Sequence, residues 1–284
     1  DPLINELYNQ IIVEKDRDAQ LRCTVQNKPT GNDVQWQAEL TNSTVAISSA
    51  TAVKTDPFKY SIDQPSPTSW RLRIQNAQVT DEGKYICRVQ TGFLNYEKDF
   101  EYLRVIEKPQ IADLQTSSDI VAKQGDDIML RCNATGRPFP VVKWRRLAGE
   151  LLPTGGQELR EFNMPILQIK PENAGVYICL ADNEAGHDER RIVVTVTHQP
   201  IVKAENKNVR QAVGFVKSLV CNVEANPEPY VSWSRDNVPI ESTNYIEVRT
   251  IVGALNKVTS VLTIYGVATT DFGEYTCLAV NTQG

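Results

Sequence analysis

Apolar and polar residues alternate in short stretches of this chain, with a period of two rather than the period of a helix. Residues 34–38 read VQWQA, and residues 85–89 read YICRV. Every second residue of a β-strand points to the same face, so Trp36 and Cys87 are expected to face a core while their neighbours face outward. The alternation therefore predicts an all-β fold.

One unit of this pattern is repeated three times. Residues 81–87 read DEGKYIC, residues 173–179 read NAGVYIC, and residues 271–277 read DFGEYTC. In each copy an earlier cysteine lies two residues after a leucine, and a tryptophan follows that cysteine after twelve or thirteen residues. A repeat of roughly ninety residues indicates three copies of one structural unit.

This set of cysteine, tryptophan and Asp-x-Gly-x-Tyr-x-Cys resembles the signature of immunoglobulin domains, whose tyrosine forms a corner and whose cysteines join two sheets. The resemblance implies three tandem immunoglobulin-like β-sandwiches, the first variable-like and the second and third intermediate-type. Six cysteines allow fifteen pairings, but the resemblance implies one disulfide in each domain. The implied pairs are Cys23–Cys87, Cys132–Cys179 and Cys221–Cys277. Asn173 replaces the aspartate of the second copy, which leaves its corner geometry open.

The expected domains are residues 1–107, 108–198 and 199–284, with a proline near each junction. The first domain has 51 residues between its tryptophan and its second cysteine, against 35 and 44 in the others. The extra length can hold the additional strands of a variable-type domain. The third domain ends before its final strand, so we expect the natural protein to continue beyond Gly284.

Composition narrows the class of protein. The paired cysteines are 64, 47 and 56 residues apart and the chain has two histidines, which does not fit a metal site. We expect no metal, no cofactor and an oxidising, extracellular compartment. Sequons at Asn42 and Asn133 predict N-glycosylation. The net charge of −5 argues against a nucleic-acid partner.

The sequence has no arrangement typical of an enzyme. Neither histidine belongs to a Ser/His/Asp or Cys/His set, and the cysteines are expected in disulfides. No apolar run reaches the ~20 residues of a membrane span, so attachment to a membrane would need an anchor outside this chain. Binding is therefore the expected activity.

Strand parity defines a candidate binding face on the first domain. Residues adjacent to the inward-facing Trp36 and Cys87 point outward, and an isoleucine among them would be exposed on a polar sheet. An exposed apolar residue beside arginine and glutamine resembles a recognition patch. The alternative is that one exposed isoleucine is ordinary and that nearby loop aromatics fold back on the core. The predicted binding residues are Gln35, Gln37, Ile86, Arg88, Gln90, Phe93 and Leu94.

Two further expectations concern the same domain. Alternation from an inward Leu103 would put Glu101 inside the sandwich, so a bulge is expected in residues 99–102, and no site is assigned there. Lys59 stands where variable-like domains usually have an arginine, and we expect it to pair with Asp81.

Four stretches resemble three-domain neuronal adhesion molecules of the immunoglobulin superfamily, the lachesin, amalgam, Dpr-interacting protein and IgLON group. They are GRPFP at 136–140, LPTGG at 152–156, ADNEAG at 181–186 and NPEP at 226–229. The resemblance implies binding to another copy or to a related protein through the outer face of the first domain. It also implies a cell-surface protein with a lipid anchor, or a secreted one. The alternative is the ligand-binding ectodomain of a signalling receptor.

Overall fold

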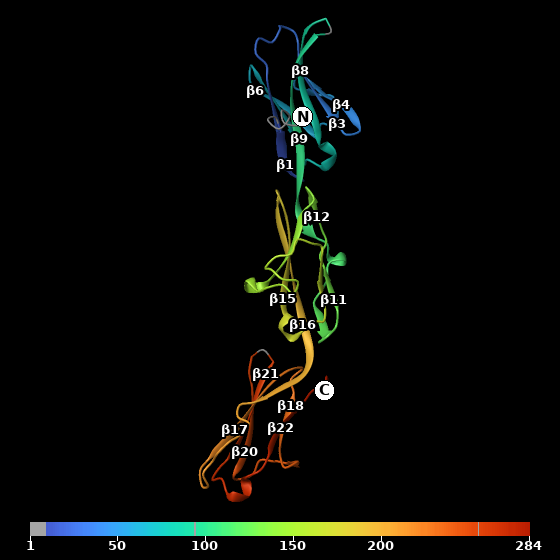
Figure 1. Cartoon of the computed structure of the whole chain (residues 1–284). Coiled ribbons are helices and arrows are strands. Elements are labelled where there is room, and N and C mark those ends of the chain that lie inside the picture. The colour runs from blue at the N-terminus through green and yellow to red at the C-terminus, as the bar shows by residue number, and fades with distance from the viewer. Residues whose placement is uncertain (1–9, 94, 255) are drawn as a thin grey trace. The chain divides into compact units, whose positions relative to one another are not determined.

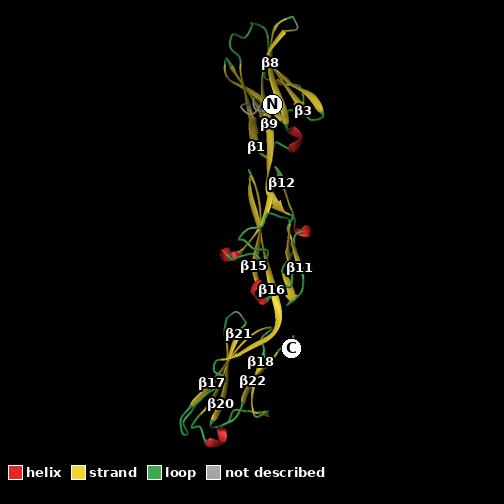
Figure 2. Cartoon of the chain, viewed as in Figure 1, coloured by secondary structure: helices red, strands yellow, loops and turns green. Residues whose placement is uncertain are grey.

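The computed structural model describes residues 10–93, 95–254 and 256–284 (Figure 1). Within these ranges the chain consists of strands, turns and single-turn 3₁₀ helices (Figure 2), which confirms the all-β prediction. Contacts divide it into two compact units. The first comprises residues 1–115, 132–143 and 179–190, and the second comprises residues 116–131, 144–178 and 191–284.

The first unit contains a sandwich of two sheets, here called the first sandwich. One sheet has the order β1-β9-β8-β3-β4-β5, in which β1 pairs with β9 in parallel and the other pairs are antiparallel. Its strands are β1 (Gln10–Glu14), β9 (Asn95–Ile111), β8 (Gly83–Gly92), β3 (Val34–Leu40), β4 (Ser43–Ser49) and β5 (Ala52–Val53). Strands β4 and β5 lie in the long segment that predicted additional strands.

The second sheet of the first sandwich has the order β2-β7-β6, with β2 (Ala19–Thr24), β7 (Ser69–Ile74) and β6 (Tyr60–Ser66). Its inward residues pack with those of the first sheet into one core that includes Leu21, Trp36, Leu72 and Tyr85. The alternation seen in the sequence produces this core, because each strand contributes every second side chain. Beyond the sandwich, β9 pairs with β12 (Ala134–Arg137).

The second unit holds two paired segments and a further sandwich. Strand β10 (Ile120–Lys123) pairs with β16 (Gly186–Ala204), and β11 (Ile128–Arg131) pairs with β14 (Asn163–Ile166). The sandwich has one sheet in which β16 continues into β17-β21-β20 and another with the order β19-β18-β22. Its strands are β17 (Lys217–Asn226), β18 (Tyr230–Arg235), β19 (Val238–Pro239), β20 (Ile246–Val252), β21 (Lys257–Ile264) and β22 (Tyr275–Val280). The chain also forms β13 (Val141–Arg146), β15 (Gly175–Asn183) and the 3₁₀ turns η2 (Val79–Asp81), η3 (Asp113–Gln115), η4 (Leu147–Gly149), η5 (Pro171–Asn173) and η6 (Thr269–Asp271).

All six cysteines form the three predicted disulfides, Cys23–Cys87, Cys132–Cys179 and Cys221–Cys277. Each copy of the repeated phrase also forms the same corner. The Tyr85 hydroxyl donates to the carbonyl of Asp81 (2.8 Å), and the matching hydroxyls in the second and third copies donate to the carbonyls of Asn173 and Asp271 (2.8 and 2.7 Å).

Asn173 does not alter its corner. Its side-chain oxygen accepts the backbone N–H of Lys170 (2.9 Å), as the Asp81 carboxylate accepts the N–H of Gln78 (2.7 Å). The neutral amide oxygen makes the same turn, so the question left open by the sequence is answered. The predicted pairing of Lys59 with Asp81 is also confirmed, with Nζ 2.5 Å from Oδ2.

Candidate binding face

The register of the larger sheet places the predicted polar residues on one outer face of the first sandwich. Gln35 lies opposite Arg88, and Gln37 lies opposite Ile86, on neighbouring strands β3 and β8. The Nε of Arg88 donates to the side-chain oxygen of Gln35 (3.2 Å). Gln90 is exposed one step further along β8. The parity argument therefore holds for these positions.

Ile86 departs from expectation. It lies outside the core cluster, on the outer side of the sheet, but only 8% of its surface is exposed. Its register partners on the same face are Gln37 on β3 and Phe100 on β9, which flank it on both sides with long side chains. The prediction of an exposed isoleucine is wrong, because side chains of adjacent strands cover it.

The hairpin that joins β8 to β9 presents an apolar tip. Phe93 is 91% exposed, so it does not fold back on the core. Leu94, also predicted at this tip, lies outside the described residues. The base of the hairpin is fixed by Asn32, whose amide donates to the carbonyl of Gln90 (2.6 Å). This hydrogen bond anchors the base of the hairpin, and Phe93 faces solvent at its tip.

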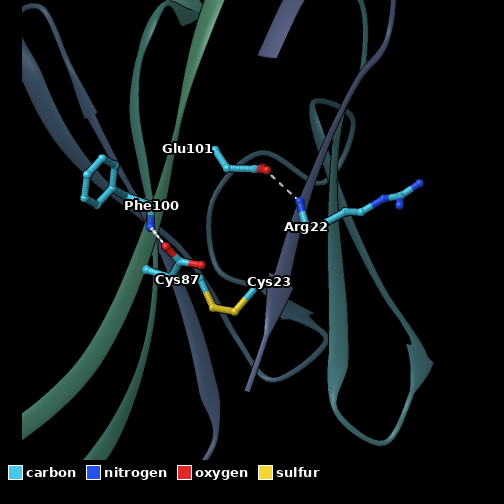
Figure 3. Close-up of a disulfide and its surroundings, with 6 residues drawn as sticks. Arg22, Cys23, Cys87, Phe100 and Glu101 are labelled. Carbon is cyan, nitrogen blue, oxygen red and sulfur yellow. Dashed lines mark hydrogen bonds between the residues drawn. A yellow bond between two sulfur atoms is a disulfide. The ribbon is translucent and has the colours of Figure 1, made fainter. Parts of the chain in front are cut away.

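The bulge expected in residues 99–102 is absent. Strand β9 keeps a regular register with β8 from Glu97 to Leu103, which places Glu101 opposite the buried Tyr85. Figure 3 shows Phe100 and Glu101 leaving β9 on opposite sides. Glu101 points inward because the backbone N–H of Arg22 on β2 donates to its carboxylate (2.9 Å). Burial raises the pKa of the Glu101 carboxyl above its usual range.

The regular register creates a row of aromatic residues that the sequence analysis missed. Tyr96, Phe100 and Tyr102 lie opposite the outward residues of β8. The Arg88 guanidinium lies 4.9 Å from the ring centre of Tyr96, and the Lys84 ammonium lies 4.1 Å from that of Phe100. Both distances fit cation–π contacts. The alternation of aromatics in the sequence was the available signal, and the assumed bulge at Glu101 concealed it.

The outer face thus combines side chains that are enriched at protein–protein interfaces, namely tyrosine, phenylalanine and arginine, on one side of a sheet. Phe100 and Tyr102 also pack edge to face, with ring centres 5.6 Å apart. The contacts fix the aromatic and cationic side chains before any partner arrives, which lowers the entropic cost of binding. The arrangement can bind a protein surface.

Both sequons are accessible. Asn42 lies in the exposed turn between β3 and β4, at the border of the outer face. Asn133 is exposed just before β12, and its side chain donates to Gln115 (3.0 Å). A search of the described residues finds no group of three or more metal-ligating side chains, and no helix there is both long and apolar enough to cross a membrane.

Comparison with known proteins identifies the domain types and the family. The immunoglobulin V-set domain model matches residues 9–105, and the immunoglobulin I-set domain model matches residues 112–196 and 200–284. Limbic system-associated membrane protein of Gallus gallus is 35% identical over 97% of this chain and 77% of its own length. Protein amalgam of Drosophila melanogaster is 28% identical over 100% of this chain and 87% of its own length.

A solved structure is also similar over nearly the whole chain. It is the crystal structure of Dpr2 Ig1-Ig2 in complex with DIP-Theta Ig1-Ig3, with a TM-score of 0.80 and 30% sequence identity. The match covers 97% of this chain and 93% of that chain.

Proposed function

Since the chain belongs to the immunoglobulin superfamily, in the group of recognition proteins that includes limbic system-associated membrane protein and amalgam, we propose that it mediates cell–cell recognition through the outer face of its first sandwich. The partner is another copy or a related immunoglobulin-superfamily protein. The family is one of binding proteins and not of enzymes.

One observation carries the proposal. The outer face of β9, β8 and β3 holds Tyr96, Phe100 and Tyr102 beside two cations, on a sheet whose inward residues form the core. Such aromatic residues have no role in the core of the sandwich, and aromatic and arginine side chains are the usual anchors of interfaces. A sheet face can supply the ~800 Å² per partner of a standard interface.

The relatives support the same mode. The similar solved structure holds Dpr2 Ig1-Ig2 in complex with DIP-Theta Ig1-Ig3, and another holds Dpr11 IG1 bound to DIP-gamma IG+IG2. The name of the Gallus gallus relative associates that protein with the limbic system and with a membrane. We therefore extend the proposal to the surface of cells of the nervous system, with a glycosylphosphatidylinositol anchor. Release of the native protein from cells by phosphatidylinositol-specific phospholipase C tests the anchor.

A glycan placed on the face tests the site. Ala46 is exposed on β4 opposite Gln37, and Ala46→Asn creates a sequon with Ser48 directly beside the β3 residues of the outer face. Pro67→Asn is the matched control, because it creates a sequon with Ser69 in the turn between β6 and β7 of the other sheet. Both variants carry one added glycan, and mass spectrometry confirms its presence.

Binding of the full chain is measured against itself and against immobilised limbic system-associated membrane protein, amalgam and lachesin. We expect Ala46→Asn to abolish every interaction that wild type shows, and Pro67→Asn to leave it unchanged. Binding that survives the Ala46→Asn glycan would show that another surface is used.

A further inference from the structure

We propose that the outer face selects an acidic partner, namely an immunoglobulin-like first domain with a surplus of carboxylates on its equivalent face, rather than a second copy of this chain. The inference rests on the proposed function, because it concerns the same face. It adds a property of the partner that the family does not define.

The outer face is basic although the chain is acidic. The charged residues at outward positions of β3, β4, β8 and of β9 from Asn95 to Tyr102 are Lys84, Arg88, Lys98 and Glu39. The face therefore carries two net positive charges on a chain whose net charge is −5. The carboxylates of Glu97, Asp99 and Glu101 belong to the opposite side of β9.

The three cations lie on the face outside the ion pairs of the described residues, although Glu39 lies opposite Lys84 on β3. Lys84 lies over the ring of Phe100, and Arg88 lies over Tyr96 while it donates to Gln35. Lys98 is exposed opposite Arg88. The ion pairs found among the described residues include none of the three. Neutral aromatic rings and an amide position Lys84 and Arg88, but they leave the charge of both side chains available to a partner.

Symmetry makes this charge unfavourable in a pair of identical copies. A two-fold interface applies the same patch to itself. Each copy contributes three cations and one carboxylate, so four positive charges of the pair lack a counter-charge. Unpaired charges are costly to bury, and like charges opposed across an interface disfavour the wrong partner. Against an acidic face the same cations are attracted instead of repelled, and the attraction also accelerates association.

A protein surface fits better than an anionic glycan. Tyr96, Phe100 and the covered Ile86 separate the cations on this side of the sheet, which makes a mixed apolar and charged surface. Sulfated glycans need clustered charge and gain little from aromatic side chains between the cations. Heparin is therefore an arm of the test.

The test uses the full chain and a charge-inverted copy of it as the acidic probe. The probe carries Lys84→Glu, Arg88→Glu and Lys98→Glu. The matched control carries Lys123→Glu, Lys203→Glu and Lys207→Glu, three exposed cations on β10, β16 and the segment after β16. Both copies change by the same net charge, so only the location differs. Thermal melting establishes that each copy is folded.

Binding to wild type is measured by biolayer interferometry at about 50 mM and about 500 mM NaCl, which span strong and weak screening. We expect the probe to bind wild type at least about tenfold more tightly than the control copy does, with the gap closing at high salt. We also expect wild type to bind itself more weakly than it binds the probe. Equal affinity for probe and control, or self-binding as tight as probe binding, overturns the inference. Heparin binding that Lys98→Glu reduces, without preference for the probe, also overturns it.

Two added variants separate this inference from the proposed function. If the triple substitution fails to fold, Lys98→Glu alone replaces it as the probe, because it changes one exposed side chain. Its gain in affinity for wild type should be smaller. Ala46→Asn in wild type should remove probe binding. If the glycan blocks self-binding but wild type shows no preference for the probe, the outer face is the binding site and the preference for an acidic partner is wrong. Probe binding that the glycan leaves intact rejects the face itself.

Discussion

The carboxylate of Glu101 accepts the backbone N–H of Arg22 across the first sandwich, from β9 to β2 (Figure 3). In the described part of the chain β2 pairs only with β7, so this N–H has no partner strand to bond. An acidic side chain is thus oriented inward to satisfy a backbone donor.

Replacement of Glu101 separates its charge from its hydrogen bond. Glu101→Leu removes the acceptor and leaves the Arg22 N–H unsatisfied, which should cost about 1–3 kcal/mol of the free energy of unfolding despite the inward position. Glu101→Gln keeps an acceptor, so it should be at least as stable as wild type at pH 7. Urea denaturation of the full chain checks both, and equal stability of the leucine variant would contradict the assigned role.

The pH dependence of that comparison follows from the raised pKa of Glu101. The folded state holds the proton more tightly than the unfolded state, so folding is favoured at low pH and the contribution is lost as the pH rises through the folded pKa. Glu101→Gln does not ionise there. Its stability relative to wild type should therefore be greatest at neutral pH and should decline as the pH falls toward the ordinary range of glutamate. A difference independent of pH would show that the charge is fully solvated.

Lys59 and Asp81 provide a second prediction. Asp81 is 7% exposed, and its carboxylate both accepts the Gln78 N–H and contacts Lys59. Lys59→Met leaves a buried carboxylate without its counter-charge and should cost about 1–3 kcal/mol. Arg71→Met is the control, because the Arg71–Asp63 pair is solvated and surface pairs contribute little. Equal losses in thermal melting would contradict the importance of burial.

Strand parity and the corner phrase are local patterns, and together with the resemblance to immunoglobulin domains they predicted the fold. The outward parity of Gln35, Gln37 and Arg88 follows from strand alternation. The disulfides and the Lys59–Asp81 pair were implied by the resemblance, and the structure confirms them. The burial of Ile86 does not, since it depends on Gln37 and Phe100 from other strands. Glu101 was misplaced because an unpaired N–H on a distant strand determines its direction. The exposure of a side chain and the hydrogen bonds at a sheet edge depend on other strands, so alternation within one strand does not predict them.

The burial of Ile86 changes what its substitution should do. Parity alone predicts that Ile86→Asp removes partner binding and leaves the fold intact. At 8% exposure, the aspartate would bring an unpaired charge among covering side chains, so the variant should also lose stability, by about 2 kcal/mol or more. Ile86→Val, which keeps an apolar side chain, is the control and should lose about 0.5–1.5 kcal/mol at most. A melting temperature of Ile86→Asp equal to that of wild type would contradict the observed burial.

The last prediction concerns two asparagines that repeat one function. The amide of Asn183 donates to the carbonyls of Glu107 and Pro138, each at 2.8 Å, within the first unit. In the second unit the amide of Asn281 donates to the carbonyls of His198 and Pro227, each at 2.9 Å. Each asparagine thus bonds one carbonyl on a long strand, Glu107 on β9 or His198 on β16, and one carbonyl of a proline.

Asn183→Asp tests this role with almost no change in size. The carboxylate has no proton to donate at pH 7 and would face two carbonyl oxygens, so it should destabilise the first unit more than Asn183→Ala does. We expect about 1–3 kcal/mol for the alanine variant, from two carbonyls left without their donor. Two facing carbonyls raise the pKa of the buried aspartate, so lowering the pH restores its proton, and the aspartate variant should recover relative to alanine as the pH falls from 7 toward about 4. Urea denaturation at pH 7 and at pH 4 measures both differences. An aspartate variant as stable as wild type at pH 7 would show that the two hydrogen bonds do not hold this junction.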